Sequence, residues 1–391
     1  MDNSRGAGPL GDVVDAAIGF TGDQVSWIGP SAEAPDATEV RSLRGCIALP
    51  GLVDAHTHAV WAGSRTDEWE ARLRGVAYQD ALAEGGGIHR TVTAVRQAPP
   101  SLLADLATWR LERLASLGST TVEVKSGYGL TLEAEIAMLR AAREAGRRAG
   151  VRVLTTYLGA HVVPHEHADR REVYVRDIIE RHLPAVVGLA DFVDVFVDDG
   201  AFTLNEGEAI LAAARNLGFG LKIHAEQLTH TGAAAMAARL GAVSADHLEC
   251  IDAEGIEAMA EHGTTAVLLP GAMVSLSLPS PPVAALREAS VPLCVATDLN
   301  PGSSTWHDLW ICASLSCMTM GLTVEEALLG VTVNSARALG RDDVGRVMVG
   351  GPADLVVMSP APGEPATPAS LLQHVGGATP RLVVAGGVRR S

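Results

Sequence analysis

Residues 47–65 read Ile-Ala-Leu-Pro-Gly-Leu-Val-Asp-Ala-His-Thr-His-Ala-Val-Trp-Ala-Gly-Ser-Arg, a short apolar run that ends in two histidines. Pro50-Gly51 punctuates the start of the run and Gly63 breaks its end, which is typical of a buried strand that leaves a sheet and opens into a loop. Side chains along a strand repeat every two residues, so His56 and His58 point to the same side. One cation could bind both imidazoles, and the stretch predicts a metal site at the end of a strand.

Downstream of this stretch, short apolar runs alternate with helical patterns. After the first strand, the predicted strands lie at 120–126, 151–158, 192–197, 220–224, 242–247, 264–269 and 291–297. The predicted helices lie at 78–117, 132–149, 172–187, 205–216, 232–240, 253–262 and 282–289. Repetition of a strand followed by a helix indicates a parallel sheet, and eight such units predict an α/β fold, a closed (β/α)8 TIM-like barrel. An open, doubly wound sheet is the competing interpretation.

Short β-type runs also occur at both ends of the chain. They lie at 13–20, 24–29, 345–349, 353–358 and 380–386, and the first two read as a hairpin. Neither end has enough residues for a core of its own. We therefore expect residues 1–47 and 345–391 to form one small composite β domain, and residues 48–344 to form the barrel.

Composition excludes several classes of protein. The chain has 391 residues, 47% of them apolar, which indicates a globular protein, and a net charge of −16 argues against nucleic-acid binding. No apolar run approaches the ~20 residues of a membrane helix, and the first residues do not resemble a secretory signal, so we expect a cytoplasmic protein without membrane contact. Five scattered cysteines suggest neither disulfides nor a thiolate metal site.

Chemically competent residues gather at the predicted strand ends, where barrels of this type carry their active sites. His56 and His58 end the first strand, His161 follows the third, His224 ends the fifth, Asp246 and His247 end the sixth, and Asp298 follows the eighth. His56, His58, His224 and Asp298 could hold one divalent cation and leave a position open for water, as catalytic sites do.

Each of these residues also has a structural interpretation. A single histidine in a strand is usually a core residue, and Asp298 could instead cap the helix that follows. We favour the metal-site interpretation because polar residues occur at five predicted strand ends. The remaining histidines are expected at the surface: His89, His165, His167, His182, His230, His262, His307 and His374.

The lysines indicate how many ions bind. The chain contains only Lys125 and Lys222, and the end of the fourth strand reads Val-Asp-Asp-Gly at 197–200, without a lysine that could become carboxylated and bridge two ions. A site for a single ion is therefore predicted.

Several longer motifs resemble the amidohydrolase superfamily and, within it, the imidazolonepropionase family. The resemblance covers nearly the whole chain and rests on segments 50–58, 63–65, 85–88, 123–129, 159–161, 220–227, 244–247 and 296–304. The His-Thr-His motif is common to the superfamily, whereas Lys-Ser-Gly-Tyr-Gly at 125–129 and Asp-Leu-Asn-Pro-Gly-Ser-Ser at 298–304 are more particular to the family.

The resemblance implies hydrolysis of 4-imidazolone-5-propanoate to N-formimino-L-glutamate by a metal-activated water, a step of histidine degradation. It implies zinc or iron on the four ligands named above, and it suggests a homodimer. The substrate contacts that it implies come from Arg65, Tyr128, His161, Gln227, Asn300, Gly302 and Ser303.

Elementary chemistry agrees with these roles. The substrate carries a carboxylate, and the planar guanidinium of Arg65 suits that group. Gly302 and Ser303 can lend backbone N–H groups to the same anion. Tyr128 lies between two glycines, which favours an exposed loop side chain.

The catalytic assignments are His161, to polarise the carbonyl oxygen, and Asp298 or His247, to transfer the proton. The choice between the last two stays open because Gln227 stands where some relatives carry a glutamate, and an amide cannot act as a base. Two rival functions remain: a ring deaminase of the same superfamily, which would release ammonia, and a non-catalytic metal-binding protein.

Overall fold

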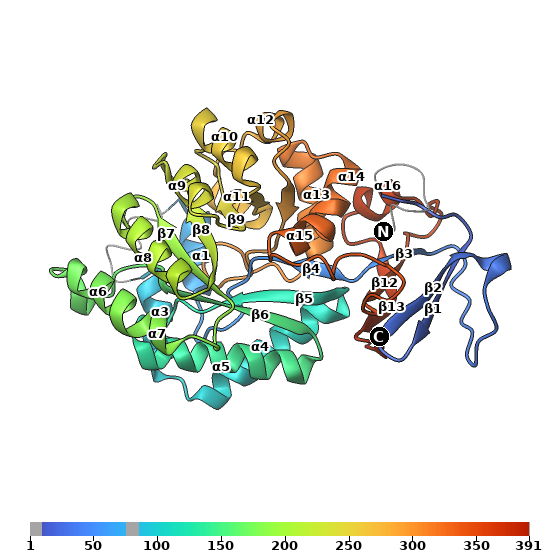
Figure 1. Ribbon diagram of the computed structural model, residues 1–391, viewed down its shortest axis with the longest axis horizontal. Helices are drawn as coiled ribbons and strands as arrows, with labels where there is room; N and C mark the ends of the chain where they lie inside the picture. Colours follow the sequence, from blue (N-terminus) through green and yellow to red (C-terminus); the bar gives the residue numbers. More distant parts are fainter. Residues whose placement is uncertain (1–9, 76–85, 391) are drawn as a thin grey trace.

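Eight parallel strands form a barrel in the computed structural model, which describes residues 10–75 and 86–390 (Figure 1). Each strand pairs with the next along the chain, in the order β4 to β11. The strands are β4 Leu52–Asp54, β5 Ser119–Lys125, β6 Arg152–Ala160, β7 Phe192–Val197, β8 Gly220–Ala225, β9 Ser244–His247, β10 Thr265–Leu268 and β11 Leu293–Val295. This order confirms the predicted barrel.

The ring closes between its first and last strands just beyond their ends. A parallel bridge joins Thr57 to Leu299. On either side of it the His58 N–H donates to the Leu299 carbonyl at 2.9 Å, and the Asp298 N–H donates to the His56 carbonyl at 3.0 Å. Below the bridge, the Asp54 carboxylate accepts hydrogen bonds from the backbone N–H and the hydroxyl of Thr297. The open-sheet interpretation is therefore wrong.

Helices surround the strands on the outside of the barrel (Figure 1). They are α1 Thr66–Leu73, α3 Ile88–Gln97, α4 Pro100–Ser116, α5 Leu132–Ala149, α6 Arg171–Asp177, the π-helical turn η3 Ile178–His182, α7 Leu183–Ala185, α8 Leu204–Asn216, α9 Ala233–Arg239, α10 Ala253–His262, α11 Pro270–Leu276, α12 Val283–Glu288, α13 Leu309–Met320, α14 Val324–Gly330 and α15 Val333–Arg337; a short 3₁₀ turn, η2, spans His165–His167. Within the described ranges, none of these helices is long and apolar enough to cross a membrane.

Local sequence signals explain the helices that match their predicted bounds. The α5 helix begins after Thr131, whose side chain accepts from the Ala134 N–H, and it ends at Gly150 in the left-handed conformation. The α10 helix has the same arrangement with Asp252 and Gly263. The helix predicted at 78–117 is divided into α3 and α4, and its first part, up to residue 85, lies outside the described residues. The α1, α11, α14 and α15 helices, together with α16 Pro368–Gln373, were not predicted, and the helix expected after the eighth strand, α13, had no predicted bounds.

The segments from the two chain ends lie side by side at one end of the barrel (Figure 1). They comprise the hairpin β1 Ala16–Thr21 and β2 Gln24–Pro30, the turn η1 Ser31–Glu33, helix α16 Pro368–Gln373, and a sheet in the order β14 Val388–Arg389, β13 Thr379–Ala385, β12 Leu355–Ser359 and β3 Ile47–Pro50. The predicted strand at 345–349 is wrong, because the chain forms turns there. The division into residues 1–47 plus 345–391 and residues 48–344 stays our proposal.

The run at 47–65 contributes to both sheets. Its first part, β3, pairs antiparallel with β12, and its second part, β4, pairs with β5 of the barrel. Gly51 separates the two, and a Cβ atom there would lie 2.2 Å from Thr120 Oγ1, so the chain can pass β5 only as glycine. The change of sheet at Gly51 aims the remainder of the run, with both histidines, at the mouth of the barrel.

Candidate metal centre

Four side chains from the first, fifth and eighth barrel strands meet at the C-terminal mouth. His56 and His58 follow β4, His224 belongs to β8, and Asp298 follows β11. The His56 Nε2 atom lies 3.3 Å from His58 Nε2, and both nitrogens lie 3.4 Å from Asp298 Oδ1. One ring nitrogen from each of the three histidines lies within 4.8 Å of the other two. The structure therefore brings the three predicted histidine ligands together and places Asp298 against two of them.

These distances fit a metal ion. Zinc binds histidine nitrogen at about 2.0–2.1 Å, so two ligands at a tetrahedral angle stand about 3.3 Å apart, close to the spacings observed here. All four side chains are buried. Among the described residues, His224 Nε2 has no hydrogen-bond partner although it is buried, as expected of an atom kept for a ligand. The alternative that Asp298 caps a helix is wrong, because Asp308 caps α13.

A second layer of carboxylates orients two of the histidines. His56 Nδ1 donates to Asp246 Oδ2 at 2.6 Å, and His224 Nδ1 donates to Asp194 at 3.0 Å. Each bond places the ring proton on Nδ1 and leaves Nε2 unprotonated and directed at the centre. This arrangement, carboxylate to histidine to metal, is the one that metal sites use to fix the orientation of their ligands.

Both lysines lie beneath the site. The Lys125 ammonium donates to Glu123 and Asp194 at 2.8 Å and lies 3.6 Å from Asp246. Burial disfavours its charged form, but Asp194, Glu123 and Asp246 together raise its pKa above the ordinary value. Lys222 donates to Ser244 at 2.8 Å and lies 3.8 Å from Asp246. Charged side chains inside otherwise apolar strands were the sequence signal for this network, which the sequence reasoning missed.

Three further predicted residues surround the ligands. The His161 ring stacks on His58 with 5.3 Å between centroids, the His247 ring lies 5.4 Å from His224, and Tyr128 lies 5.4 Å from His161. Tyr128 is only 3% exposed, so the expectation of an exposed side chain is wrong. Burial lowers the pKa of His161 and of His247 well below the ordinary value, and both rings are neutral at pH 7.

The tautomer of His161 bears on its predicted role. Its Nδ1 donates to the Gly127 carbonyl at 3.1 Å, so Nε2 of the neutral ring carries a lone pair and no proton. A nitrogen of this kind accepts a hydrogen bond and cannot polarise a carbonyl oxygen by donating one. The geometry therefore favours a substrate contact for His161 over the predicted polarising role.

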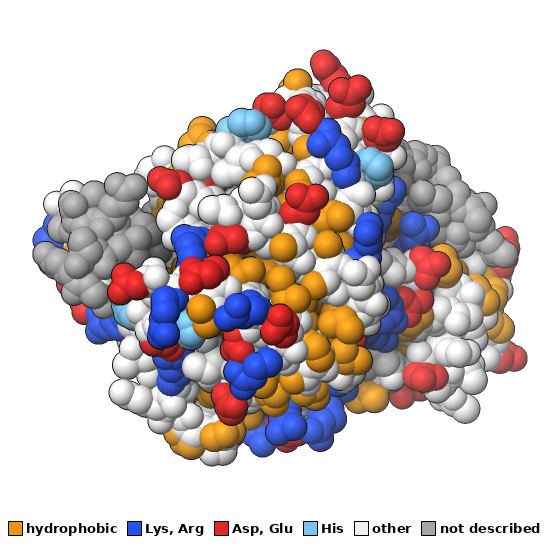
Figure 2. Space-filling view, turned by 60° about the vertical axis from the view of Figure 1, so that its left-hand side comes forward, with side chains coloured by type: hydrophobic (Ala, Val, Ile, Leu, Met, Phe, Trp, Pro, Cys, Tyr) orange, Lys and Arg blue, Asp and Glu red, His pale blue; other side chains and the backbone are white. Residues whose placement is uncertain are grey.

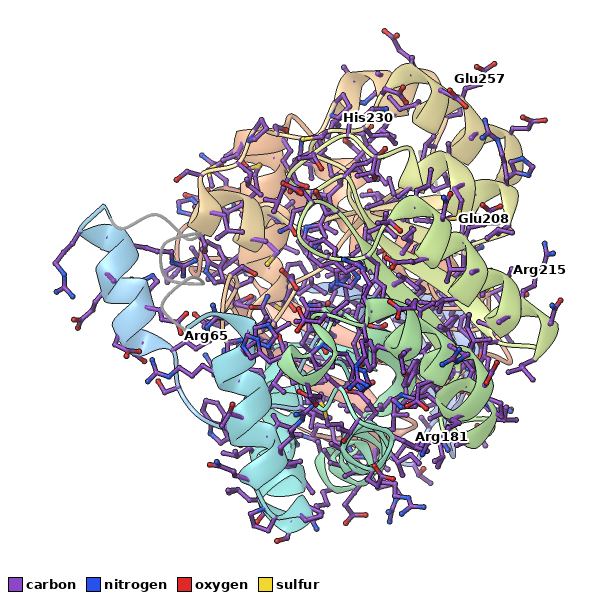
Figure 3. All side chains as sticks on the ribbon, turned by 90° about the vertical axis from the view of Figure 1, so that its left-hand side faces the viewer. Arg65, Arg181, Glu208, Arg215, His230 and Glu257 are labelled. Carbon is purple, nitrogen blue, oxygen red and sulfur yellow. The ribbon has the colours of Figure 1, made fainter. Side chains whose placement is uncertain are left out.

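The predicted anion-binding residues lie on the loop after β11 and at the start of α1. Asn300 Oδ1 accepts from the N–H groups of both Gly302 and Ser303 at 2.7 Å, so in this structure these N–H groups hold the loop. The Arg65 side chain is 7% exposed and donates to Glu68 at 2.8 Å. A Cβ atom on Gly302 would lie 2.3 Å from Arg65 Nη1, so the guanidinium packs directly against Gly302. Figure 3 shows Arg65 beside α1.

Two buried acids near the end of β8 and β9 were not singled out from the sequence. Glu226 accepts from the Gly232 N–H at 2.9 Å and pairs with His230, whereas the neighbouring Gln227 is buried to 8% exposure. Glu249 is fully buried two residues beyond His247, and burial raises its pKa to about 8. Acidic residues directly after a strand-end histidine were the available signal.

The expectation that His182 lies at the surface, like the other histidines outside the predicted site, is wrong. His182 is 1% exposed, and its Nδ1 accepts from the Tyr157 hydroxyl at 2.7 Å. His230 is half exposed and lies away from Arg65 in Figure 3. On the face drawn in Figure 2, acidic and basic side chains are interspersed with apolar ones. The five cysteines are free thiols.

Comparisons with known proteins give consistent results. The amidohydrolase family model matches residues 47–390. Imidazolonepropionase from Shewanella putrefaciens (strain CN-32) is 46% identical over 385 residues, which cover 96% of this chain and 93% of that protein. Imidazolonepropionase from Shewanella baltica (strain OS155) is 47% identical over 363 residues, which cover 90% and 88%.

Solved structures share the fold. A triazine hydrolase from Arthobacter aurescens superposes with a TM-score of 0.76 at 19% identity and covers 96% of this chain and 90% of its own. An adenosine deaminase from Xanthomonas campestris with bound zinc gives a TM-score of 0.69 at 19% identity, with coverage of 96% and 88%. At these identities the likeness concerns the fold alone.

Proposed function

The chain belongs to the amidohydrolase family and, within it, to the imidazolonepropionases, and from this premise we propose that it hydrolyses 4-imidazolone-5-propanoate to N-formimino-L-glutamate in histidine degradation. The single observation that carries the proposal is the convergence of three histidines and Asp298 at the barrel mouth, with 3.3–3.4 Å between the facing atoms of His56, His58 and Asp298. Such a centre can hold an ion that activates the water needed for hydrolysis of the ring amide.

We assign one metal ion, zinc or iron, to His56, His58, His224 and Asp298. Neutral imidazole nitrogens and a carboxylate suit either metal. A bound ion of this kind supplies Lewis acidity and lowers the pKa of a coordinated water from about 15.7 to about 7. The absence of a lysine from the end of β7 and the engagement of Lys125 by three carboxylates support a single ion over a bridged pair.

The protein residues bind and orient the substrate and move the proton. Attack of water on the ring carbonyl carbon, followed by cleavage of the ring C–N bond, requires a group that takes a proton from the water and returns one to the leaving nitrogen. We propose Asp298 or His247 for this transfer, because both side chains border the same space. His161 accepts a substrate N–H through Nε2, and Tyr128 and Gln227 complete the wall of the site.

The propanoate group of the substrate is assigned to Arg65. Its guanidinium packs on Gly302, beside the loop that Asn300 organises. An acidic protein with a net charge of −16 needs a local cation to hold an anion, and a buried guanidinium does so through charge-assisted bonds. Gly302 and Ser303 stay candidates for the same anion if Asn300 releases their N–H groups.

The test is a turnover assay on freshly prepared 4-imidazolone-5-propanoate. We expect loss of the imidazolone absorbance with stoichiometric N-formimino-L-glutamate and without ammonia. Ammonia release would instead identify a ring deaminase, and bound metal without turnover would identify a metal-binding protein. The cytoplasmic location and the homodimer expected from the sequence stay predictions.

Arg65→Ala tests the assignment of the carboxylate. Loss of a charge-assisted bond worth about 1.5–3 kcal/mol should lower kcat/KM by roughly 10- to 150-fold. Arg74→Ala, at the opposite end of α1 and 69% exposed, is the control for loss of an arginine from this helix and should change nothing. An effect of Arg65→Ala below about twofold would mean that the carboxylate binds elsewhere.

A further inference from the structure

A glutamate two residues beyond His247 is buried without a partner. The Glu249 side chain is 0% exposed, and in the described part of the chain neither of its carboxyl oxygens has a hydrogen-bond partner. Leaving such a group unsatisfied costs about 1–3 kcal/mol, and native proteins rarely accept that cost without a use for the group. The function assigned above makes no use of Glu249.

A second buried polar atom without a partner faces this carboxyl group. Among the described residues, His247 Nδ1 has no hydrogen-bond partner, and it lies 3.9 Å from Glu249 Oε2. This separation is about 1 Å longer than a hydrogen bond. In free enzymes catalytic hydrogen bonds are often long, and they shorten when the substrate binds. The two unpartnered atoms can therefore satisfy each other through a small movement.

The backbone between the two residues is held in an uncommon conformation. His247 has φ 82° and Leu248 has φ 76°, both in the left-handed region, which costs about 1–3 kcal/mol for each residue. Two hydrogen bonds fix this turn to the end of β8: the Leu248 N–H donates to Ala225 at 3.1 Å, and the Cys250 N–H donates to Glu226 at 2.8 Å. The turn directs both the imidazole and the carboxyl group inward.

We propose that Glu249 is a positioning residue for His247, which it orients through a hydrogen bond to Nδ1 so that Nε2 serves the metal centre. The proposal rests on the proposed function, in which His247 is a candidate for proton transfer. His247 is neutral, so its single ring proton lies on Nδ1, which donates to the carbonyl oxygen of the protonated Glu249 carboxyl group and leaves the lone pair of Nε2 free to take a proton. Burial and the nearby carboxylates of Asp298 and Asp198 keep a proton on Glu249 near neutral pH, which is consistent with this bond.

The position of Glu249 also bears on the amide at position 227. Gln227 stands where some relatives carry a glutamate, so an amide takes the place of an acid at that position, and the adjacent Glu226 is engaged by a backbone N–H and by His230. Glu249, at the end of the adjacent strand β9, supplies a carboxyl group to the same mouth. In this proposal Glu249 affects the reaction only through its hydrogen bond to His247.

The first test is a double-mutant cycle between Glu249 and His247. Glu249→Leu removes both hydrogen-bonding oxygens and should lower kcat by roughly 10- to 100-fold with little change in KM, whereas Glu249→Gln keeps an acceptor and a donor and should recover most of the activity. In a His247→Ala background, Glu249→Leu should have less than a twofold effect. An equal loss in both backgrounds would overturn the proposal.

Glu257→Leu serves as the matched control, because Glu257 is exposed on α10 and lies at the edge of the molecule in Figure 3. Metal content and the urea unfolding midpoint are measured for every variant. Equal metal content in Glu249→Leu and the parent protein separates a positioning effect from loss of the centre.

The second test does not depend on turnover. With ¹⁵N-labelled histidine in the purified metal-loaded protein, the ring signals of His247 are identified by their absence from His247→Ala. We expect them to change in Glu249→Leu and to be largely retained in Glu249→Gln. Unchanged His247 signals in Glu249→Leu would overturn the proposal for any substrate. Changed signals without hydrolysis of the imidazolone would uphold it and refute the proposed function alone.

Discussion

Asp246→Asn should weaken metal binding without removing any metal ligand. Asp246 accepts the Nδ1 proton of His56 at 2.6 Å and is one of three buried carboxylates, with Asp194 and Glu123, that face the ammonium groups of Lys125 and Lys222. In the parent protein these five groups carry a net charge of −1, which favours a cation above them. The substitution keeps an oxygen beside His56 but removes the charge.

The expected magnitude follows from two contributions. Hydrogen bonds to a charged acceptor are roughly twice as strong as neutral ones, and substitutions in this layer typically cost 10- to 100-fold in metal affinity, or about 1.4–2.7 kcal/mol. The unfolding free energy should fall as well, by about 3–5 kcal/mol, since a member of a buried ion-pair network is lost. Lys125 keeps its hydrogen bonds to two carboxylates, Glu123 and Asp194, at 2.8 Å, which limits the loss of stability.

The assay is competition for the metal with a chromophoric chelator of known affinity, combined with urea unfolding of the metal-free protein. Asp105→Asn is the control, because Asp105 is a 64% exposed carboxylate paired with Arg148. A second variant, Asp246→Asn with Lys222→Met, restores the net charge of −1 without restoring the carboxylate beside His56.

The two variants separate the contributions. If the carboxylate acts by orienting His56, the double variant stays as weak as the single one; if net charge dominates, it recovers affinity. A metal affinity for Asp246→Asn within twofold of the parent protein would refute the role assigned to this layer.

Three further perturbations test other parts of the site. His56→Ala should lose metal and turnover together, and an active, metal-free variant would contradict the ligand assignment. Gly302→Ala places a Cβ atom 2.3 Å from Arg65 Nη1, so it should displace the guanidinium. We expect KM to rise about tenfold, which corresponds to about 1.4 kcal/mol of binding free energy, with kcat largely retained. An unchanged KM would show that Arg65 does not hold the substrate. Glu249 has a folded pKa of about 8 against an ordinary 4.5, so the native state binds more protons than the unfolded state between these pH values, and stability falls as pH rises through this window. Glu249→Gln removes this dependence. The unfolding free energy of the metal-free variant, relative to that of the metal-free parent protein, should therefore increase by about 3–5 kcal/mol from pH 5 to pH 8. A difference in urea unfolding that stays constant with pH would contradict this expectation.

The barrel was predictable because its signals are local. Strands such as β5 are buried along their whole length and read as short runs between turn residues, and helices such as α5 carry a visible cap at each end. The proximity of the proposed ligands followed from the same source, because the end of a strand fixes where a side chain points. Once the strands were placed, their carboxyl ends had to converge.

The predictions that were wrong all concern features that depend on contacts between residues far apart in the sequence. The strand expected at 345–349 has suitable residues, but the sheet is completed by β3, nearly 300 positions earlier in the chain. Tyr128 and His182 are buried because partners from other elements cover them. The residues next to them in the sequence do not indicate this burial. The bond from His56 to Asp246 joins residues 190 positions apart, so the sequence shows an acid in a strand without showing its partner.

The seam that closes the barrel has a consequence for synthesis of the protein. Asp54 and Thr297, which join across it, stand 243 positions apart, and three of the proposed ligands, His56, His58 and Asp298, flank the same seam. A growing polypeptide on the ribosome holds His56 and His58 long before Asp298 has been translated. The nascent chain therefore lacks the complete set of proposed ligands until the eighth strand emerges, so we expect the metal to be acquired only when the barrel closes.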